Sequence, residues 1–121
     1  MYRSLILLFA LSAQAHEMTP AYPKLEPSHV DGVKKTTMEM FNRRSDVSFY
    51  EIGVFTEKWQ SVPFVTSYTI VKLDYLKKVR FEVYIRDEDA KYATYICSQS
   101  KLRNDASKAP MVSSKICSKI K

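Results

Sequence analysis

The most regular pattern in the chain is an alternation of apolar and polar residues, which is typical of β-strands. In the stretch 78–86, "KVRFEVYIR", every second residue is apolar and the residues between are charged or tyrosine. Because successive side chains of a strand point to opposite faces, this pattern predicts a strand with one face on a hydrophobic core. The apolar residues of that face are Val79, Phe81, Val83 and Ile85.

Other stretches combine β-branched and aromatic residues in the same way, whereas helical periodicity is scarce. Asp31-Gly32 and the polar run 42–46 are turn signals between such stretches, and the charged run 86–91 predicts a surface loop or a short helical turn. About seven short strands separated by turns predict a single antiparallel β-sandwich. The further predicted strands are 34–42, 47–55, 67–73, 92–98 and 111–120.

The first fifteen residues, "MYRSLILLFALSAQA", have the order of a secretory signal peptide. A single charge at Arg3 precedes an apolar run, and Ala13 and Ala15 form an Ala-x-Ala site. The apolar run is shorter than the ~20 residues that a transmembrane helix needs, and no later stretch suits a membrane span. We therefore expect a signal peptide at 1–15, a domain at 16–121, and export to the periplasm or the cell exterior.

The sequence contains two cysteines, Cys97 and Cys117. In an exported protein an even pair of cysteines predicts a disulfide, and the alternative is two buried free thiols. Two cysteines with no histidine nearby in sequence do not make a zinc site.

Charge is concentrated near the C-terminus. From Ser98 onward six basic residues stand against Asp105 alone, whereas basic and acidic residues balance between His16 and Cys97. Such a tail could face an acidic surface, or it could simply be a solvated end of the domain. No basic stretch is interleaved with aromatic residues, so we expect no nucleic-acid binding.

Four stretches together have the arrangement of a known family. They are an extended segment before an Asp-Gly turn, a threonine-containing strand ending in asparagine, an aromatic strand leading to a tryptophan turn, and a basic strand followed by a loop and a tyrosine strand. The chain from 25 to 102 thereby resembles the N-terminal immunoglobulin-like domain of periplasmic pilus chaperones. The stretches are "LEPSHVDG" (25–32), "KTTMEMFNRRSD" (35–46), "VSFYEIGVFTEKW" (47–59) and "KKVRFEVYIRDEDAKYATYICS" (77–98).

This resemblance implies an immunoglobulin-like fold and a chaperone-like binding or assembly role toward a protein partner. The family binds by adding an edge strand to an incomplete partner fold. The strand 78–86 is the candidate, with its apolar face filling the partner's groove, unless that face packs on the protein's own core. The family also holds its client's terminal carboxylate with a basic pair, and the matching first-strand region here reads Glu26, Pro27 and Ser28, without an arginine.

A periplasmic copper-binding protein is the alternative function. After cleavage behind Ala15, the amine and imidazole of His16 could chelate Cu(II), and His29 could complete a histidine brace with Asp31 beside it. In the absence of a metal these are an exposed terminal histidine and one at a strand end.

We expect no enzymatic activity. The chain has two glycines, too few for a phosphate-cradling loop, and the run from Asp87 to Asp89 is typical of a solvated surface. Cysteines joined in a disulfide cannot act as nucleophiles. Apart from the alternative copper ion, no cofactor is predicted.

Overall fold

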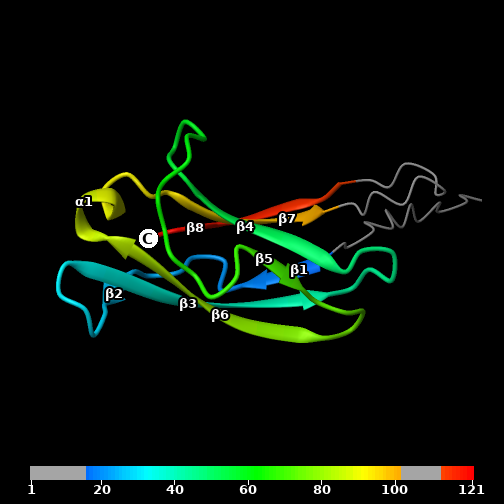
Figure 1. The fold of residues 1–121 in the computed structure, drawn as a ribbon. Helices are drawn as coiled ribbons and strands as arrows, with labels where there is room; N and C mark the ends of the chain where they lie inside the picture. The colour runs from blue at the N-terminus through cyan, green and yellow to red at the C-terminus, as the bar shows by residue number, and fades with distance from the viewer. Residues whose placement is uncertain (1–15, 102–112) are drawn as a thin grey trace, which may run out of the picture.

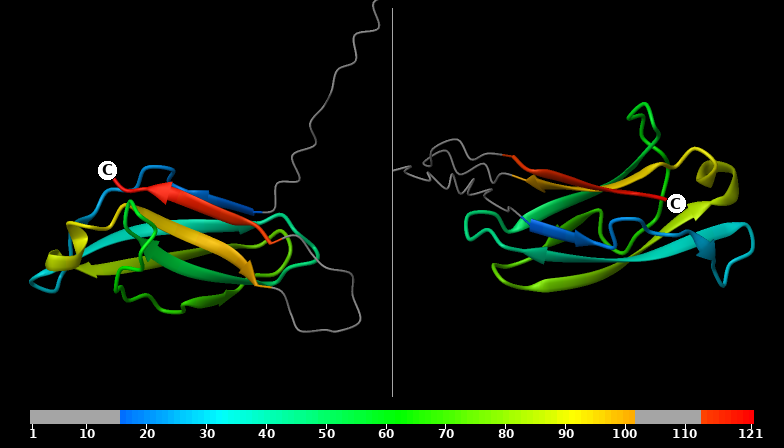
Figure 2. Two further views of the ribbon diagram at one scale, coloured as in Figure 1. Left: turned by 90° about the horizontal axis from the view of Figure 1, so that it is seen from above. Right: turned by 180° about the vertical axis from the view of Figure 1, so that it is seen from behind.

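The computed structural model describes residues 16–101 and 113–121, and the expected signal peptide at 1–15 lies outside the described residues. The described chain is nearly all β, in two antiparallel sheets that pack face to face (Figures 1 and 2). The elements are β1 (His16–Thr19), β2 (Glu26–Pro27), β3 (Val33–Asn42), β4 (Phe49–Phe55), β5 (Ile70–Lys72), β6 (Lys78–Arg86), α1 (Asp87–Ala90), β7 (Tyr95–Lys101) and β8 (Lys115–Lys119).

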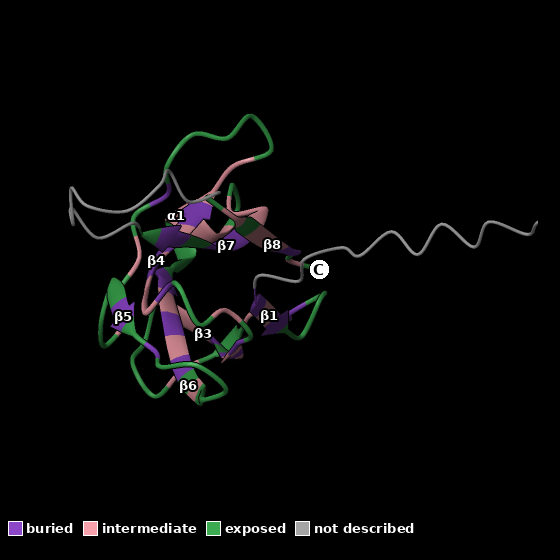
Figure 3. Ribbon diagram, turned by 90° about the vertical axis from the view of Figure 1, so that its right-hand side faces the viewer, coloured by how far each residue is buried: buried purple, intermediate pink, exposed green. Residues whose placement is uncertain are grey.

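The first sheet is centred on β3, which is its longest strand. Along one side of β3 lie β1 and then β2, and along the other side lies β6. The second sheet has the order β5-β4-β7-β8, so that β8 is an edge strand. Figure 3, which looks along the strands, shows β4, β7 and β8 above β1, β3 and β6, with β1 and β8 on the same side.

The core between the sheets is made by the apolar face of each strand. Met38 and Met40 of β3, and Val83 and Ile85 of β6, are buried, while the residues between them point outward. Removing such side chains from water is the main stabilising contribution of a sandwich, at roughly 25 cal/mol per Å² of apolar surface. In the part of the chain that the structure describes, no helix is long and apolar enough to cross a bilayer.

The predicted strands are confirmed, with shifts at their ends. The strand predicted at 78–86 is β6 itself, and the charged run after it contains the short helix α1. The strand predicted at 67–73 is shortened to β5, and β7 begins three residues later than predicted and continues to Lys101. Residues 111 and 112 of the last predicted strand lie outside the described residues.

A buried asparagine joins the two sheets at one end of the sandwich. Asn42 ends β3 and is 0% exposed. Its Nδ2 donates to the carbonyl oxygens of Val47 (2.7 Å) and Leu73 (2.8 Å). Its Oδ1 accepts the backbone N–H of Arg44 (2.8 Å) and the hydroxyl of Tyr50 (2.5 Å). One side chain therefore fixes the turn after β3, the start of β4 and the end of β5.

We predict that Asn42→Ala lowers the free energy of unfolding by about 3 kcal/mol or more, because it leaves several buried polar groups without partners. Urea denaturation followed by fluorescence measures this value. Thr37→Ala, at an exposed position of the same strand, is the control and should cost about 1 kcal/mol or less. Equal stability of the two variants would contradict the role of Asn42.

Candidate functional site

The edge strand β8 has backbone groups that its neighbour does not use. The N–H of Ile120 donates to Thr94, and the N–H of Ser100 donates to Ser114, so the even-numbered residues of β8 bond to β7. The odd-numbered residues therefore point their backbone groups away from β7, as the alternation of an antiparallel ladder requires.

The segment after β1 covers only half of this edge. The N–H of Lys119 donates to Ala21 and that of Lys121 donates to Pro23, each at 2.9 Å. At Lys115 and Cys117 no such neighbour is found among the described residues. Figure 2 shows β1 and β8 along the same side of the sandwich. β1 lies close to the first half of β8, but no backbone hydrogen bond joins the two strands among the described residues. The outward backbone groups of Lys115 and Cys117 are therefore unpaired there, and unpaired groups at a strand edge can pair with another chain.

The inner side of β8 packs thinly against the core. Ile116 and Ile120 are only half-buried, and the residue between them, Ser118, is buried. Ser98 and Ser100 of β7 continue this buried row of small hydroxyl side chains. Serines bury little apolar surface, so hydrophobic packing contributes less here than between β3 and β6.

A disulfide compensates for this thin packing. Cys97 of β7 and Cys117 of β8 are directly paired and bonded, which confirms the predicted disulfide. The bond closes a loop over a sequence separation of 20 residues, which by the chain-entropy estimate contributes about 3 kcal/mol.

On the outer face, the start of β8 is also held by an aromatic cluster. The Nζ of Lys115 lies 4.5 Å from the ring centre of Phe55 and 4.9 Å from that of Trp59. Trp59 in turn stacks on Tyr95 with 4.3 Å between ring centres. This cation–π contact fixes the side chain of Lys115 on the outer face of the sheet.

His16 connects the first strand to the other sheet. Its imidazole is buried, and it shares hydrogen bonds with the hydroxyls of Ser98 (Nε2, 2.8 Å) and Ser114 (Nδ1, 3.3 Å). The ring also packs on Tyr50, with 4.6 Å between centres. Burial lowers the pKa of His16 below its ordinary value, a hydrogen bond to Ser98 partly offsets this, and the positive charge of Arg44 lowers it further.

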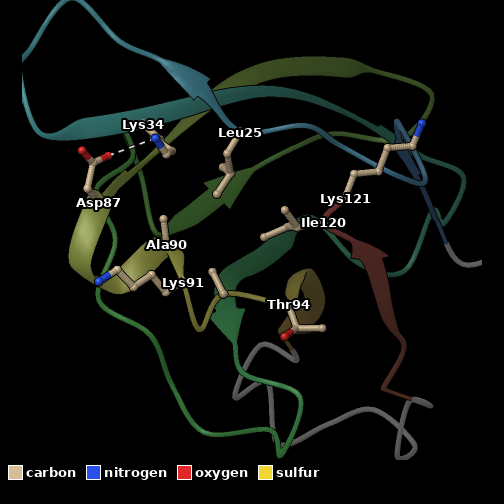
Figure 4. Close-up of a pocket in the computed structure, with 9 residues that line it drawn as sticks. Leu25, Lys34, Asp87, Ala90, Lys91, Thr94, Ile120 and Lys121 are labelled. Atoms are coloured by element: carbon tan, nitrogen blue, oxygen red, sulfur yellow. Dashed lines mark ion pairs between the residues drawn. The ribbon is translucent and has the colours of Figure 1, made fainter.

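A pocket of about 590 Å³ lies where β8 ends, at the end of the sandwich that carries α1 (Figure 4). Leu25 and Ile120 form its apolar wall together with two alanines. Three lysines surround it, of which Lys34 is paired with Asp87 at 3.3 Å. No ion pair is found for Lys91 or Lys121 within the described ranges. The pocket therefore combines an apolar surface with an excess of positive charge.

The apolar face of β6 that the sequence suggested for partner binding packs on the protein's own core. Phe81, Val83 and Ile85 are in the hydrophobic core, and Val79 is half-buried against it. This is the alternative that the sequence left open. A strand added beside β6 would meet backbone groups and outward side chains, not this apolar face.

The residues proposed for copper do not fit a copper site. His16 lies opposite Asn42, whereas His29 follows β2, which lies opposite Lys34 and Lys35. At ~3.3 Å per residue along β3 these places are about 25 Å apart, far more than one ion can bridge. Both ring nitrogens of His16 also face serine hydroxyls. No cluster of metal-binding side chains is present among the residues described, Asp31 included.

The residues that make the β8 edge were not recognised from the sequence. The alternation in "KICSKI" places Ile116, Ser118 and Ile120 on one face, and this signal was available. What the sequence does not display is the path of residues 20–23, which decides how much of the edge stays open. The basic pocket is assembled from four separate segments and has no local signal.

Comparisons with known proteins agree with the fold. No family model and no curated protein matches the sequence. Among solved structures, the E. coli chaperone DraB matches with a TM-score of 0.64 and 17% identity over 87% of this chain and 52% of DraB. A FixG-related protein from Vibrio parahaemolyticus matches with a TM-score of 0.49 and 12% identity, over 88% of this chain and 94% of that one.

The likeness to DraB confirms the immunoglobulin-like sandwich that the sequence predicts, and confirms the resemblance to chaperone domains at the level of the fold. The chain spans about half the length of DraB.

We predict that replacing both cysteines, Cys97→Ala with Cys117→Ala, lowers the free energy of unfolding by about 3 kcal/mol. Because serine packing alone holds β8 weakly, amide exchange in β8 should accelerate more than exchange in β3. Urea denaturation and hydrogen exchange measure these changes. Uniform acceleration over both strands would contradict a specific role in holding β8.

We predict that the protein loses stability as the pH falls below about 6.5, the ordinary histidine pKa in an unfolded chain. Because the pKa of folded His16 is lowered, the unfolded chain binds the proton first, and protonation favours unfolding. His16→Gln removes this contribution, so the difference in stability between wild type and variant should shrink from pH 7 to pH 5. A pH-independent difference in urea denaturation would contradict it.

Proposed function

We propose that this chain is an exported, non-catalytic binding module that pairs the open edge of β8 with an extended segment of a protein partner. The chaperone-like fold supports a binding role, and the observation that carries the proposal is the half-covered edge at Lys115 and Cys117. Strand addition supplies affinity through backbone hydrogen bonds and specificity through alternate side chains.

The edge of β8 is a better site than the edge of β6. Near its end, β6 is already bridged by Val65, whose N–H and carbonyl both bond to Tyr84 at 2.8 Å. The outward side chains of β6 include Arg80 and Glu82, which suit solvent. On β8, by contrast, Ile116 is partly exposed between the unpaired backbone groups of Lys115 and Cys117, so an added strand would complete its burial.

The pocket at the end of β8 extends the same site. A partner segment paired at Lys115 and Cys117 would leave the edge of β8 where residues 21–23 cover it, and its continuation could reach the apolar wall formed by Leu25 and Ile120. Lys91 and Lys121 would then favour an acidic group at that end of the segment. The sequence already lacks the arginine of the pilus chaperones at 26–28, so these lysines would take its place in attracting negative charge.

Export and the absence of catalysis are parts of this proposal. The disulfide agrees with an oxidising compartment, and the N-terminal sequence has the order of a signal peptide. Both cysteines are used in the disulfide, and the two histidines are far apart, which favours binding over chemistry.

The test begins with cross-linking in the cells that produce the protein. A photo-cross-linking residue at position 115 should capture the partner, whereas one at position 80 on β6 should not. In the isolated complex, the backbone amides of Lys115 and Cys117 should then exchange more slowly with solvent, because they become hydrogen-bonded. Protection of β6 amides alone would overturn the proposal.

We predict that Ile116→Ser together with Ile120→Ser weakens binding of the captured partner by roughly tenfold or more, because each variant removes apolar surface that the partner buries. Ile70→Ser, at an exposed position of the opposite edge strand β5, is the matched control and should leave the affinity unchanged. Titration by calorimetry measures both. Equal effects of the two sets of variants would count against β8.

A further inference from the structure

The turn between β5 and β6 presents two large apolar side chains to solvent. Tyr75 is 50% exposed and Leu76 is 54% exposed. The turn lies at the end of the sandwich that is opposite the basic pocket, next to the turn between β3 and β4 (Figure 1). It is therefore separate from the pocket proposed to receive the end of a partner strand.

This turn is fixed rather than loosely attached. Leu76 donates its N–H to the carbonyl of Asn42 at 2.8 Å, and Asn42 donates its own N–H to Lys77 at 3.1 Å. Lys77 also donates to Asp74, and the side chain of Asn42 binds the carbonyl of Leu73. The buried asparagine therefore holds the turn from both sides, and the two apolar side chains project from a rigid support.

Leu76, at the tip of the turn, has a backbone conformation that is unusual for a leucine. Leu76 has a φ of 61°, in the left-handed region where glycine and asparagine are preferred. A leucine at this position costs conformational energy, which only limited burial offsets, since the residue is more than half exposed. Backbone outliers of this kind are enriched at functional sites.

Basic residues surround the tip. Lys72, Lys77 and Arg80 are exposed and have no ion pair within the described ranges. Lys78 and Arg43 add further positive charge, although each pairs with a glutamate, at 3.7 Å and 2.9 Å. The acidic side chain within the turn is Asp74. The surface therefore combines two projecting apolar groups with an excess of positive charge.

We propose that the Tyr75–Leu76 turn docks the protein on an anionic lipid surface, with the two side chains entering the interface and the basic residues facing the headgroups. Apolar side chains beside lysines and arginines are the composition of interfacial membrane binding. A stable protein interface buries about 800 Å² on each partner, which two side chains at a narrow tip do not supply. A lipid surface needs only the tip and the charges around it.

The experiment is co-sedimentation of the purified protein with vesicles of phosphatidylglycerol mixed with phosphatidylcholine, and with vesicles of phosphatidylcholine alone. The protein should sediment with the anionic vesicles and be released by high salt. Leu76→Asn should reduce binding by roughly tenfold, since it removes the apolar tip. Asparagine is favoured at positive φ, so this variant should fold at least as well as the wild type.

Tyr92→Ser is the matched control, because Tyr92 is 66% exposed and lies at the opposite end of the sandwich, just after α1. It should leave vesicle binding unchanged. A tryptophan at position 75 in a Trp59→Phe background should shift its emission to the blue when anionic vesicles are added, as it enters the interface.

Several results would overturn the proposal. The first is a failure to sediment with anionic vesicles, and the second is equal binding to the two kinds of vesicle. Binding that Leu76→Asn does not change would place the lipid contact elsewhere. If the protein did not bind vesicles and Leu76→Asn weakened capture of the protein partner, the turn would be part of a protein interface instead.

Discussion

The buried side chain of Asn42 is the interaction on which the geometry of one end of the sandwich depends. Asn42 satisfies polar groups from three separate segments, which are the turn after β3, the start of β4 and the end of β5. In a medium of low polarity each of these bonds is costly to lose, so the cluster specifies one arrangement of the turns. The exposed Tyr75–Leu76 turn and the path of β4 both follow from this single residue.

On the side where β1 and β8 meet, by contrast, side-chain packing determines the arrangement of the strands less strongly. There the inter-sheet space is lined by serines and by His16, and stability comes from hydrogen bonds and the disulfide more than from apolar packing. A strand held in this way keeps its position while its outer backbone groups remain partly unpaired. Strand addition needs this combination of a fixed backbone and an incomplete ladder.

Much of the fold could be predicted from the sequence, because alternation in a half-buried strand is a local signal. The stretch 78–86 predicted β6 residue for residue, and the two cysteines predicted their own bond. The same signal misled about binding, since an apolar face that could fill a partner's groove is also the face that fills the protein's own core. Whether Val83 faces inward or toward a partner depends on the second sheet, which the local pattern does not contain.

The extent of the proposed binding edge depends on contacts that are distant in sequence. Lys119 and Lys121 are covered because residues 21 and 23, about one hundred positions earlier, run alongside them. Shortening that early segment would open the edge, and extending its pairing toward Cys117 would close it. The early segment therefore sets how much of β8 a partner can reach, although its residues contribute little to the core. The path of residues 20–23, and not the composition of β8 alone, therefore decides how much of this edge is available to the proposed partner.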